Sequence, residues 1–178
     1  MTDSVVLRRF RPVHAAALAD AVNESLDHLR PWMAWATVTV NTSDEEAILR
    51  EAEAKFDAGS EFAFLIFSHD DQVVGACGLH PRRGPGVLEV GYWVHVGHTG
   101  RGYAKAAIGR LVEEAFALPE VGHVEIRCDE TNVASAAVPR RLGFNLVRVE
   151  NREPRTPAET ARELVWVLTR EELERSIV

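Results

Sequence analysis

A strand joined to a helix through two glycines constrains this chain more than any other stretch. The run His98-Thr99-Gly100-Arg101-Gly102-Tyr103-Ala104-Lys105 follows segment 87–96, whose β-branched and aromatic residues are typical of a half-buried strand. From residue 104 to 116, apolar residues recur at three- and four-residue steps, which indicates an amphipathic helix. The first N–H groups of a helix lack internal partners and lie at the positive end of its dipole. The sequence therefore predicts an anion-binding loop, with Gly100 and Gly102 allowing close approach.

Two classes of phosphate ligand use such a loop, dinucleotides and coenzyme A. A dinucleotide-binding sequence places its glycines after the first strand of a parallel sheet and continues to a third glycine, where this chain has Lys105. Here the loop begins only at residue 98, after three segments that predict an antiparallel meander. Coenzyme A is therefore favoured over a dinucleotide. A glycine turn that merely joins strand to helix is the remaining alternative.

The rest of the pattern predicts an α/β (α+β) fold in a single domain spanning residues 1–178. Strands are expected at 5–11, 61–68, 72–80, 87–96, 121–128, 145–150 and 164–169. About four helices are expected, at 12–26, 43–59, 104–119 and 132–142, the second opened by the capping-box spacing of Ser43-Asp44-Glu45-Glu46. Only the strands flanking the glycine-loop helix must be parallel, so we expect a mixed, mostly antiparallel seven-stranded sheet with one splayed parallel pair.

The net charge and the cysteine content indicate which partners and which cell compartment to expect. The 27 acidic and 20 basic residues give a net charge of -7, which disfavours direct binding of nucleic acid. Cys77 and Cys128 lie far apart in apolar runs, so we expect buried free thiols and no disulfide. Residues 1–9 lack the basic and apolar regions of a signal peptide, and no segment has the length of a membrane span. We expect a cytoplasmic monomer or homodimer without a membrane partner.

Two smaller features are the tryptophan segment and the histidines. Segment 29–37 concentrates two tryptophans around a proline, and it either plugs the core or lines a substrate site. His95 and His98 are three residues apart but fall in a strand and a loop, so they are not expected to share the face that a metal pair would need. No other histidine has metal-ligand spacing, and we expect no metal.

With these elements placed, the chain resembles the GCN5-related N-acetyltransferase (GNAT) superfamily over nearly all of its length. The pyrophosphate-loop pattern of that family, Gln/Arg-x-x-Gly-x-Gly/Ala, falls on Thr99, Gly102 and Ala104, and Thr99 departs from the usual first residue. A later family pattern, Asn-x-x-Ser followed by Leu-Gly-Phe, is met by Asn132, Ser135 and Leu142-Gly143-Phe144. The resemblance implies the GNAT fold and acetyl-CoA as cofactor.

Within the superfamily, three segments are similar to the RimJ/RimL-type ribosomal-protein N-terminal acetyltransferases. They are Gly91-Tyr92-Trp93, His28-Leu29-Arg30-Pro31-Trp32 and Asn132-Val133-Ala134-Ser135. That branch acetylates protein α-amines, but its signature also covers relatives that acetylate drugs, polyamines and amino acids. The resemblance therefore implies acetyl transfer to a primary amine by direct attack, without fixing the acceptor.

The resemblance also implies which residues meet the cofactor. A backbone N–H near Trp93 or Val94 is expected to polarise the thioester carbonyl, and the loop amides are expected to bind the pyrophosphate. Asn132 is expected to contact the cofactor as well as to cap its helix. The full set of expected cofactor contacts is Trp93, Val94, Thr99, Gly100, Arg101, Gly102, Tyr103, Ala104, Asn132 and Ser135.

Two catalytic roles follow from what the motif has and lacks. Many family members have a general-acid tyrosine where this chain has Pro139, which carries no proton to donate. A proline within a helix also frees the carbonyl four residues earlier, that of Ser135. Ser135 is the candidate donor to the leaving thiolate, with helix capping as its alternative role. Glu125 is the candidate base, and its rivals are Glu89, Asp129 and Glu130.

The sequence offers no obvious strong base, and this favours one class of acceptor. An α-amine with a pKa near 8 is about one-tenth neutral at pH 7, whereas a lysine near 10.4 is neutral in fewer than about one molecule in a thousand. We therefore expect the amino terminus of a protein or peptide as acceptor. A small amine, such as an aminoglycoside, polyamine or amino acid, is the alternative, and a coenzyme A-binding module without turnover is a third.

Overall fold

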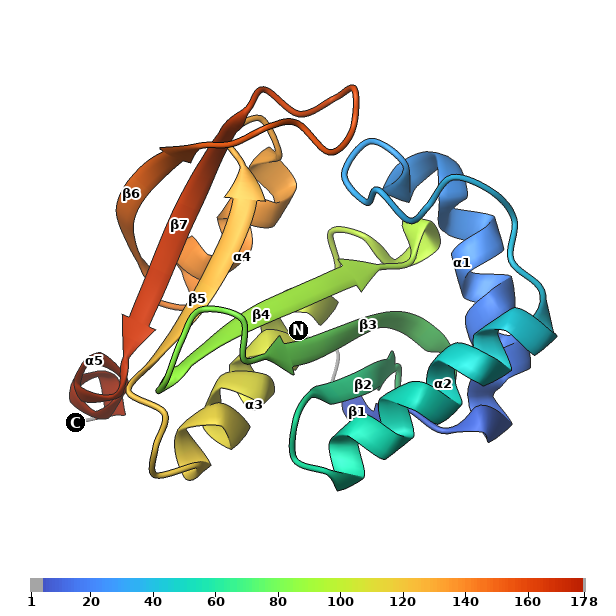
Figure 1. Cartoon of the computed structure of the whole chain (residues 1–178), viewed down its shortest axis with the longest axis horizontal. Helices are drawn as coiled ribbons and strands as arrows, with labels where there is room; N and C mark the ends of the chain where they lie inside the picture. Colours follow the sequence, from blue (N-terminus) through green and yellow to red (C-terminus); the bar gives the residue numbers. More distant parts are fainter. Residues whose placement is uncertain (1–4, 178) are drawn as a thin grey trace.

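Seven strands form one mixed sheet in the order β1-β2-β3-β4-β5-β7-β6 (Figure 1). This computed structural model describes residues 5–177. Residues 1–4, which belong to the segment where no signal peptide is expected, lie outside the described residues. The strands are β1 (Val6–Arg9), β2 (Phe62–Phe67), β3 (Val73–His80), β4 (Val87–Val94), β5 (His123–Asp129), β6 (Asn145–Asn151) and β7 (Arg162–Thr169). The predicted sheet is confirmed, because β4 and β5 pair parallel and the other neighbours pair antiparallel.

Within the part of the chain that the structure describes, five α-helices accompany the sheet, one more than expected. They are α1 (Ala15–Leu29), α2 (Thr42–Asp57), α3 (Tyr103–Ala117), α4 (Val133–Arg141) and α5 (Arg170–Ile177). Helix α5 was missed because its sequence is largely charged, although its Leu173 packs against the core. The predicted capping box of α2 is wrong: the cap is Asn41, whose side chain accepts from the Asp44 N–H. No helix within residues 5–177 is long and apolar enough to cross a membrane.

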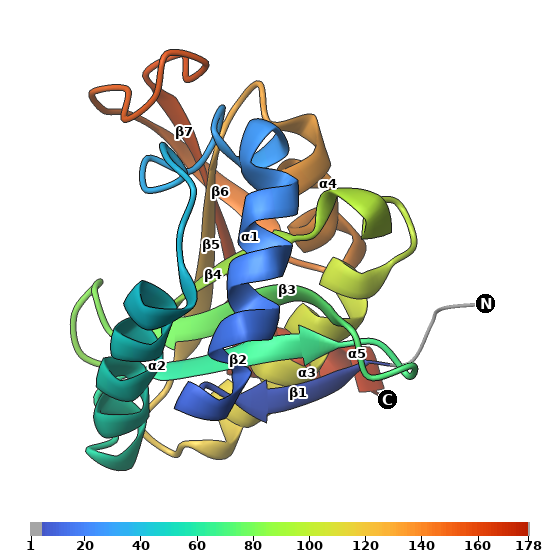
Figure 2. The same cartoon turned by 90° about the vertical axis from the view of Figure 1, so that its right-hand side faces the viewer.

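The helices divide between the two faces of the sheet, and each face has its own apolar core (Figure 2). One core joins α1 and α2 to β2 and β3 through residues such as Leu26, Leu49 and Leu65. The other joins α3 and α4 to the middle of the sheet, with Ile108 and Ile126 completely buried. Cys77 and Cys128 are buried free thiols in this second core, as expected.

The parallel pairing between β4 and β5 is short. It runs from Val87 opposite His123 to Val90 opposite Ile126, and then stops although both strands continue. Figure 1 shows the two strands diverging beyond this point, β4 toward α1 and β5 toward α4. We call the divergence the split. It lies at the carboxyl ends of both strands, where the glycine loop and α4 begin.

A close backbone approach holds the β4 side of the split against β3. A Cβ atom placed on Gly75 of β3 would lie 2.2 Å from the Trp93 carbonyl oxygen of β4. No side chain fits there unless the two strands separate. Gly75 therefore fixes the position of the β4 segment that borders the split.

Replacing Gly75 tests this packing. We expect Gly75→Ala to lower the free energy of unfolding by about 1–3 kcal/mol, because the methyl group would overlap a backbone atom. Gly109→Ala is the matched control, since its added Cβ would meet only Leu142 Cδ2 at 3.6 Å. That helical control should be neutral or stabilising by up to about 1 kcal/mol. Equal unfolding energies for the two variants in urea titrations would contradict the account.

Candidate functional site

Helix α1 fixes the segment between β4 and the glycine loop. The buried Ser25 hydroxyl accepts from the Val96 N–H at 3.1 Å, and Glu24 bonds the Nε2 atom of His95 at 2.9 Å. The Nδ1 atom of His95 accepts from the Gly97 N–H at 3.0 Å, so the proton of the neutral ring lies on Nε2 and is donated to Glu24. The strand ends at Val94 rather than at residue 96 because residues 96–98 form a 3-10 turn.

The loop backbone has the conformation that its glycines suggested. Gly100 and Gly102 have φ angles of 74° and 86°, in the left-handed region that favours glycine. Gly102 is the N-cap of α3, which has no side-chain cap. The N–H groups of Gly100, Arg101 and Gly102 donate no hydrogen bond to any residue that the structure describes. Three backbone donors at a helix N-terminus are therefore left for an anion.

The side chains around the loop divide into supporting and exposed groups. Tyr103 is buried, and its ring packs against that of His98 at 5.7 Å between centroids. The Thr99 hydroxyl donates to the Val96 carbonyl at 3.2 Å, which stabilises the turn. Arg101 is exposed and Lys105 is also on the surface, so both cations can add to the field of the backbone donors.

The direction of the amides distinguishes Val94 from Trp93. The His95 N–H donates to the Val74 carbonyl of β3, and the Trp93 carbonyl also faces β3 at Gly75. Because N–H directions alternate along a strand, the amide of Val94 faces away from β3, toward the split. Of the two positions expected to polarise a carbonyl, only Val94 presents its N–H there. The side chain of Trp93 lies on the α1 side, packed against the first core.

Helix α4 begins where β5 ends, on the other side of the split. Asn132 is its N-cap, as predicted, and the Asn132 side chain accepts from the Ser135 N–H at 3.1 Å. The Ser135 carbonyl, which Pro139 leaves without a helical donor, accepts from the Tyr92 hydroxyl at 3.0 Å. A second contact of 3.0 Å joins the hydroxyls of Tyr92 and Ser135. Tyr92 was quoted as part of a motif but not predicted as a site residue.

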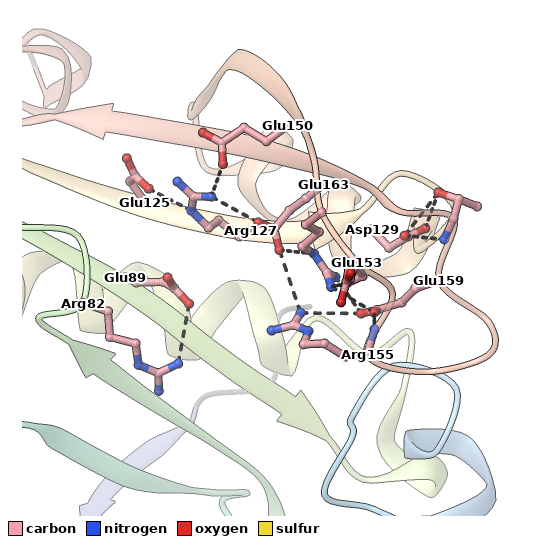
Figure 3. A network of polar contacts seen from close by, with 12 residues as sticks. Arg82, Glu89, Glu125, Arg127, Asp129, Glu150, Glu153, Arg155, Glu159 and Glu163 are labelled. Atoms are coloured by element: carbon pink, nitrogen blue, oxygen red, sulfur yellow. Dashed lines mark hydrogen bonds and ion pairs between the residues drawn. The ribbon is translucent and has the colours of Figure 1, made fainter.

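The sheet face opposite α3 and α4 carries a network of acidic and basic side chains centred on Arg127 (Figure 3). Arg127 is the first β5 residue beyond the parallel pairing, and only 8% of its side chain is exposed. It pairs with Glu125 at 3.0 Å, Glu150 at 2.6 Å and Glu163 at 3.1 Å. Hydrogen bonds from Arg148 and Arg127 lower the pKa of Glu150 to about 2. The buried guanidinium therefore has three carboxylate partners.

The candidate base Glu125 belongs to this network. It alternates along β5 with Val124 and Ile126, which pack toward α3, so its carboxylate lies on the opposite face of the sheet from Ser135. The structure does not bring these two predicted catalytic residues together on one face. Its rivals are also paired: Glu89 with Arg83, Glu130 with Arg162, and Asp129 with two threonines.

Asp129 ties the end of β5 to the loop between β6 and β7. Its carboxylate accepts from the N–H and hydroxyl of Thr131 and from the N–H of Thr160. Burial raises the pKa of Asp129, but the hydrogen bonds from Thr131 and Thr160 outweigh it and the net shift is downward. Thr156, in the same loop, donates its hydroxyl to the Pro31 carbonyl in the α1–α2 loop. The two loops beside the split are thus joined, and Figure 1 shows them meeting above it.

The tryptophan segment, residues 29–37, has buried and exposed parts, and its role at a substrate site stays a prediction. Leu29 and Ala36 are buried in the core beneath α1, whereas Trp35 is 50% exposed. The Trp35 ring contacts the Trp93 ring edge-on at 6.4 Å between centroids. An exposed indole therefore borders the strand that forms one side of the split.

The placement of His95 within the strand is wrong, because β4 ends at Val94 and His95 precedes the turn that leads to His98. The 3-10 turn between them brings their rings to 5.3 Å between centroids. Burial, and after it the electrostatic effect of the neighbouring His95 and Arg101, lowers the pKa of His98. Among residues 5–177, no group of three or more His, Cys, Asp or Glu side chains is placed to hold a metal ion.

Comparison with known proteins identifies a family of this architecture. Residues 4–145 match the model of the acetyltransferase (GNAT) domain. YdaF of Bacillus subtilis (strain 168), assigned as a ribosomal N-acetyltransferase, is 26% identical over 151 residues, or 81% of this chain and 79% of YdaF.

Two solved structures show the same fold at low identity. The ribosomal L7/L12 α-N-protein acetyltransferase RimL, solved with coenzyme A, has a TM-score of 0.85 at 18% identity. The match covers 95% of this chain and 96% of the RimL chain. The microcin C7 self-immunity acetyltransferase MccE, solved with acetyl-CoA and AMP, has a TM-score of 0.85 at 19% identity. The match covers 94% of this chain and 93% of the MccE chain.

The linkage between Asp129 and the β6–β7 loop predicts a pH dependence. A carboxyl group whose folded pKa is depressed stabilises the protein above its unfolded pKa of about 4, and this contribution is lost as the pH falls through the folded value. We expect Asp129→Asn to lower the free energy of unfolding at pH 7 by about 1–3 kcal/mol and to flatten the loss below about pH 4. Asp27→Asn, at a side chain that is 94% exposed, is the control for urea titrations across pH. An unchanged acid limb in Asp129→Asn would contradict the linkage.

Proposed function

Because the chain belongs to the acetyltransferase (GNAT) domain family, we propose that it acetylates the α-amine at the amino terminus of a protein or peptide. It is an acetyl-CoA-dependent N-acetyltransferase, and acetyl-CoA supplies an acetyl thioester for direct attack by a neutral amine. The observation that carries the proposal is the junction of an anion-binding loop with an open pair of strands. Both features present backbone N–H groups at the same end of β4.

The residues around the loop fit the diphosphate of coenzyme A. The amides of Gly100, Arg101 and Gly102 would bind its oxygens, with Arg101 and Lys105 contributing charge. Thr99, Tyr103 and Ala104 hold the loop and continue it into α3. The side-chain oxygen of Asn132, Oδ1, accepts the capping hydrogen bond from the Ser135 N–H, which leaves the side-chain NH₂ group to donate to the cofactor. The loop and α4 would thus hold the cofactor from opposite sides of the split.

Residues on both sides of the split supply the groups that acetyl transfer requires. The Val94 N–H is placed to stabilise the negative charge that develops on the thioester oxygen. Ser135 would donate a hydrogen bond to the departing sulfur. Glu125 would accept the proton that the amine loses. The proton would reach it through a water molecule, because the Glu125 carboxylate is held by Arg127. These roles divide the acid and base functions between the two faces of the sheet.

The ionisation state of the acceptor favours an α-amine. Each carboxylate considered as base is paired with an arginine or with hydroxyl and amide donors, so none is free to deprotonate a strongly basic amine. An α-amine is already about one-tenth neutral at pH 7, whereas a lysine side chain is about a hundred times less so. The names of YdaF and RimL, which refer to ribosomal-protein acetylation, support the same acceptor class.

One observation favours a second candidate, a small primary amine. The hydrogen bond from Thr156 to Pro31 joins the two loops beside the split, which would restrict a long acceptor. The microcin C7 self-immunity acetyltransferase MccE, solved with acetyl-CoA and AMP, shares the fold. The two candidates differ in acceptor size and use the same cofactor site.

The loop assignment predicts the effect of one glycine substitution. We expect Gly102→Val to raise the Kd for coenzyme A at least about tenfold, since it places a branched side chain at a left-handed residue beside the expected diphosphate. Gly84→Val is the matched control, because Gly84 also has a positive φ, 101°, with no atom within 4 Å of its added Cβ. Calorimetric titration measures both Kd values. Equal Kd values for the two variants would contradict the loop assignment.

Acceptor choice is tested by competition between amines. We expect peptides with a free α-amine to gain one acetyl group faster than peptides whose only amine is a lysine side chain, by about tenfold or more at pH 7. Mass spectrometry after incubation with acetyl-CoA measures both products, with aminoglycosides and polyamines as further acceptors. Acetylation confined to the small amines would exclude the peptide proposal and leave the cofactor site unaffected.

A further inference from the structure

Pro139 creates a need that Tyr92 meets. Pro139 is completely buried within α4, and it has no N–H to donate to the carbonyl of Ser135 four residues earlier. A buried carbonyl without a donor is costly. The Tyr92 hydroxyl, from β4, supplies the missing hydrogen bond at 3.0 Å. A strand residue thus completes a helix on the opposite side of the split.

The same phenol controls the direction of the Ser135 hydroxyl. The oxygens of the two hydroxyl groups are 3.0 Å apart, and either could donate. The carbonyl of Ser135 can only accept, and Tyr92 has a single proton. Both contacts are satisfied together only when Tyr92 donates to the carbonyl and Ser135 donates to Tyr92. In this arrangement the serine proton points toward β4.

Tyr92 occupies a position from which it can hold this arrangement. It follows Val90, the last β4 residue paired with β5, by two positions, so it extends from one side of the split to α4 on the other. Burial raises the pKa of its hydroxyl far above neutrality, and the contact with Ser135 only partly offsets this effect. The phenol therefore remains protonated, as the bond to the carbonyl requires.

Without Tyr92, the Ser135 hydroxyl has a second neighbour in the Cys128 thiol. Burial raises the pKa of that thiol to about 11, and an interaction with the Ser135 side chain partly offsets this effect. A protonated thiol is a weak acceptor, but it lies in the core rather than at the split. Loss of the tyrosine hydroxyl would allow the serine to turn toward the core.

We propose that Tyr92 is a positioning residue that keeps the Ser135 hydroxyl on the β4 side of α4, facing the split where the sulfur of acetyl-CoA would lie, an inference that rests on the role proposed for Ser135. When the carbon–nitrogen bond forms and the carbon–sulfur bond breaks, the sulfur keeps the electron pair. The Ser135 hydroxyl then turns from Tyr92 to the thiolate and donates a hydrogen bond to it. The proton lost by the amine passes to the base, and the released thiolate takes a proton from solvent.

A double-mutant cycle tests the proposal. We expect Tyr92→Phe to lower kcat by about tenfold and to leave the KM for acetyl-CoA within about twofold of its original value, because one hydrogen bond in the transition state is weakened. Ser135→Ala should lower kcat by at least as much. The double variant should be no slower than Ser135→Ala alone, since Tyr92 acts through Ser135. Cys128→Ala, which leaves the Tyr92–Ser135 contact in place, is the control and should retain its kcat.

Each other outcome identifies which assignment fails. Full activity of Tyr92→Phe beside an impaired Ser135→Ala would overturn the positioning role and leave the role of Ser135 intact. Losses that multiply in the double variant would show that Tyr92 acts independently, which also overturns it. An unchanged kcat in Ser135→Ala would remove the proposed role of Ser135 and this inference with it. Circular dichroism spectra and melting temperatures establish that each variant is folded before its kinetics are compared.

Discussion

The early end of the parallel pairing between β4 and β5 is the constraint on which the rest of the structure depends. Four residue pairs hold the strands together, and beyond Val90 and Ile126 each strand continues without the other. Backbone groups that leave a ladder require new partners. The amide of Val94 and the donors of the glycine loop are presented at this one place. A ligand with a carbonyl and a diphosphate can therefore pair with backbone groups that the sheet does not use.

The two sides of the split are held by different kinds of interaction. Apolar packing with α1 and α2 and the close contact at Gly75 position the β4 side. On the β5 side, ion pairs around Arg127 and the hydrogen bonds of Asp129 join β5, β6, β7 and their loops (Figure 3). Ionic contacts of this kind are directional and specify geometry. Tyr92 and Ser135 connect the two sides.

The sequence predicted the sheet, four of the helices and the position of the loop, because periodic apolar residues and glycines determine these features locally. It did not predict α5, whose charged sequence has little periodicity. Nor could it predict the direction of the Val94 amide or the pairing of Arg127 with three glutamates, since both depend on strand register. Tyr92 could have been suspected, because Pro139 leaves a carbonyl that needs a donor. Which donor lies beside it is a question of tertiary structure.

The central claim is that the loop amides and the split bind the same molecule of acetyl-CoA. A crystal structure of the protein with coenzyme A tests this claim most directly. The account predicts diphosphate oxygens within hydrogen-bonding distance of the amides of Gly100, Arg101 and Gly102, and the sulfur between Val94 and Ser135. Coenzyme A bound elsewhere, or bound here with those amides unoccupied, would contradict it.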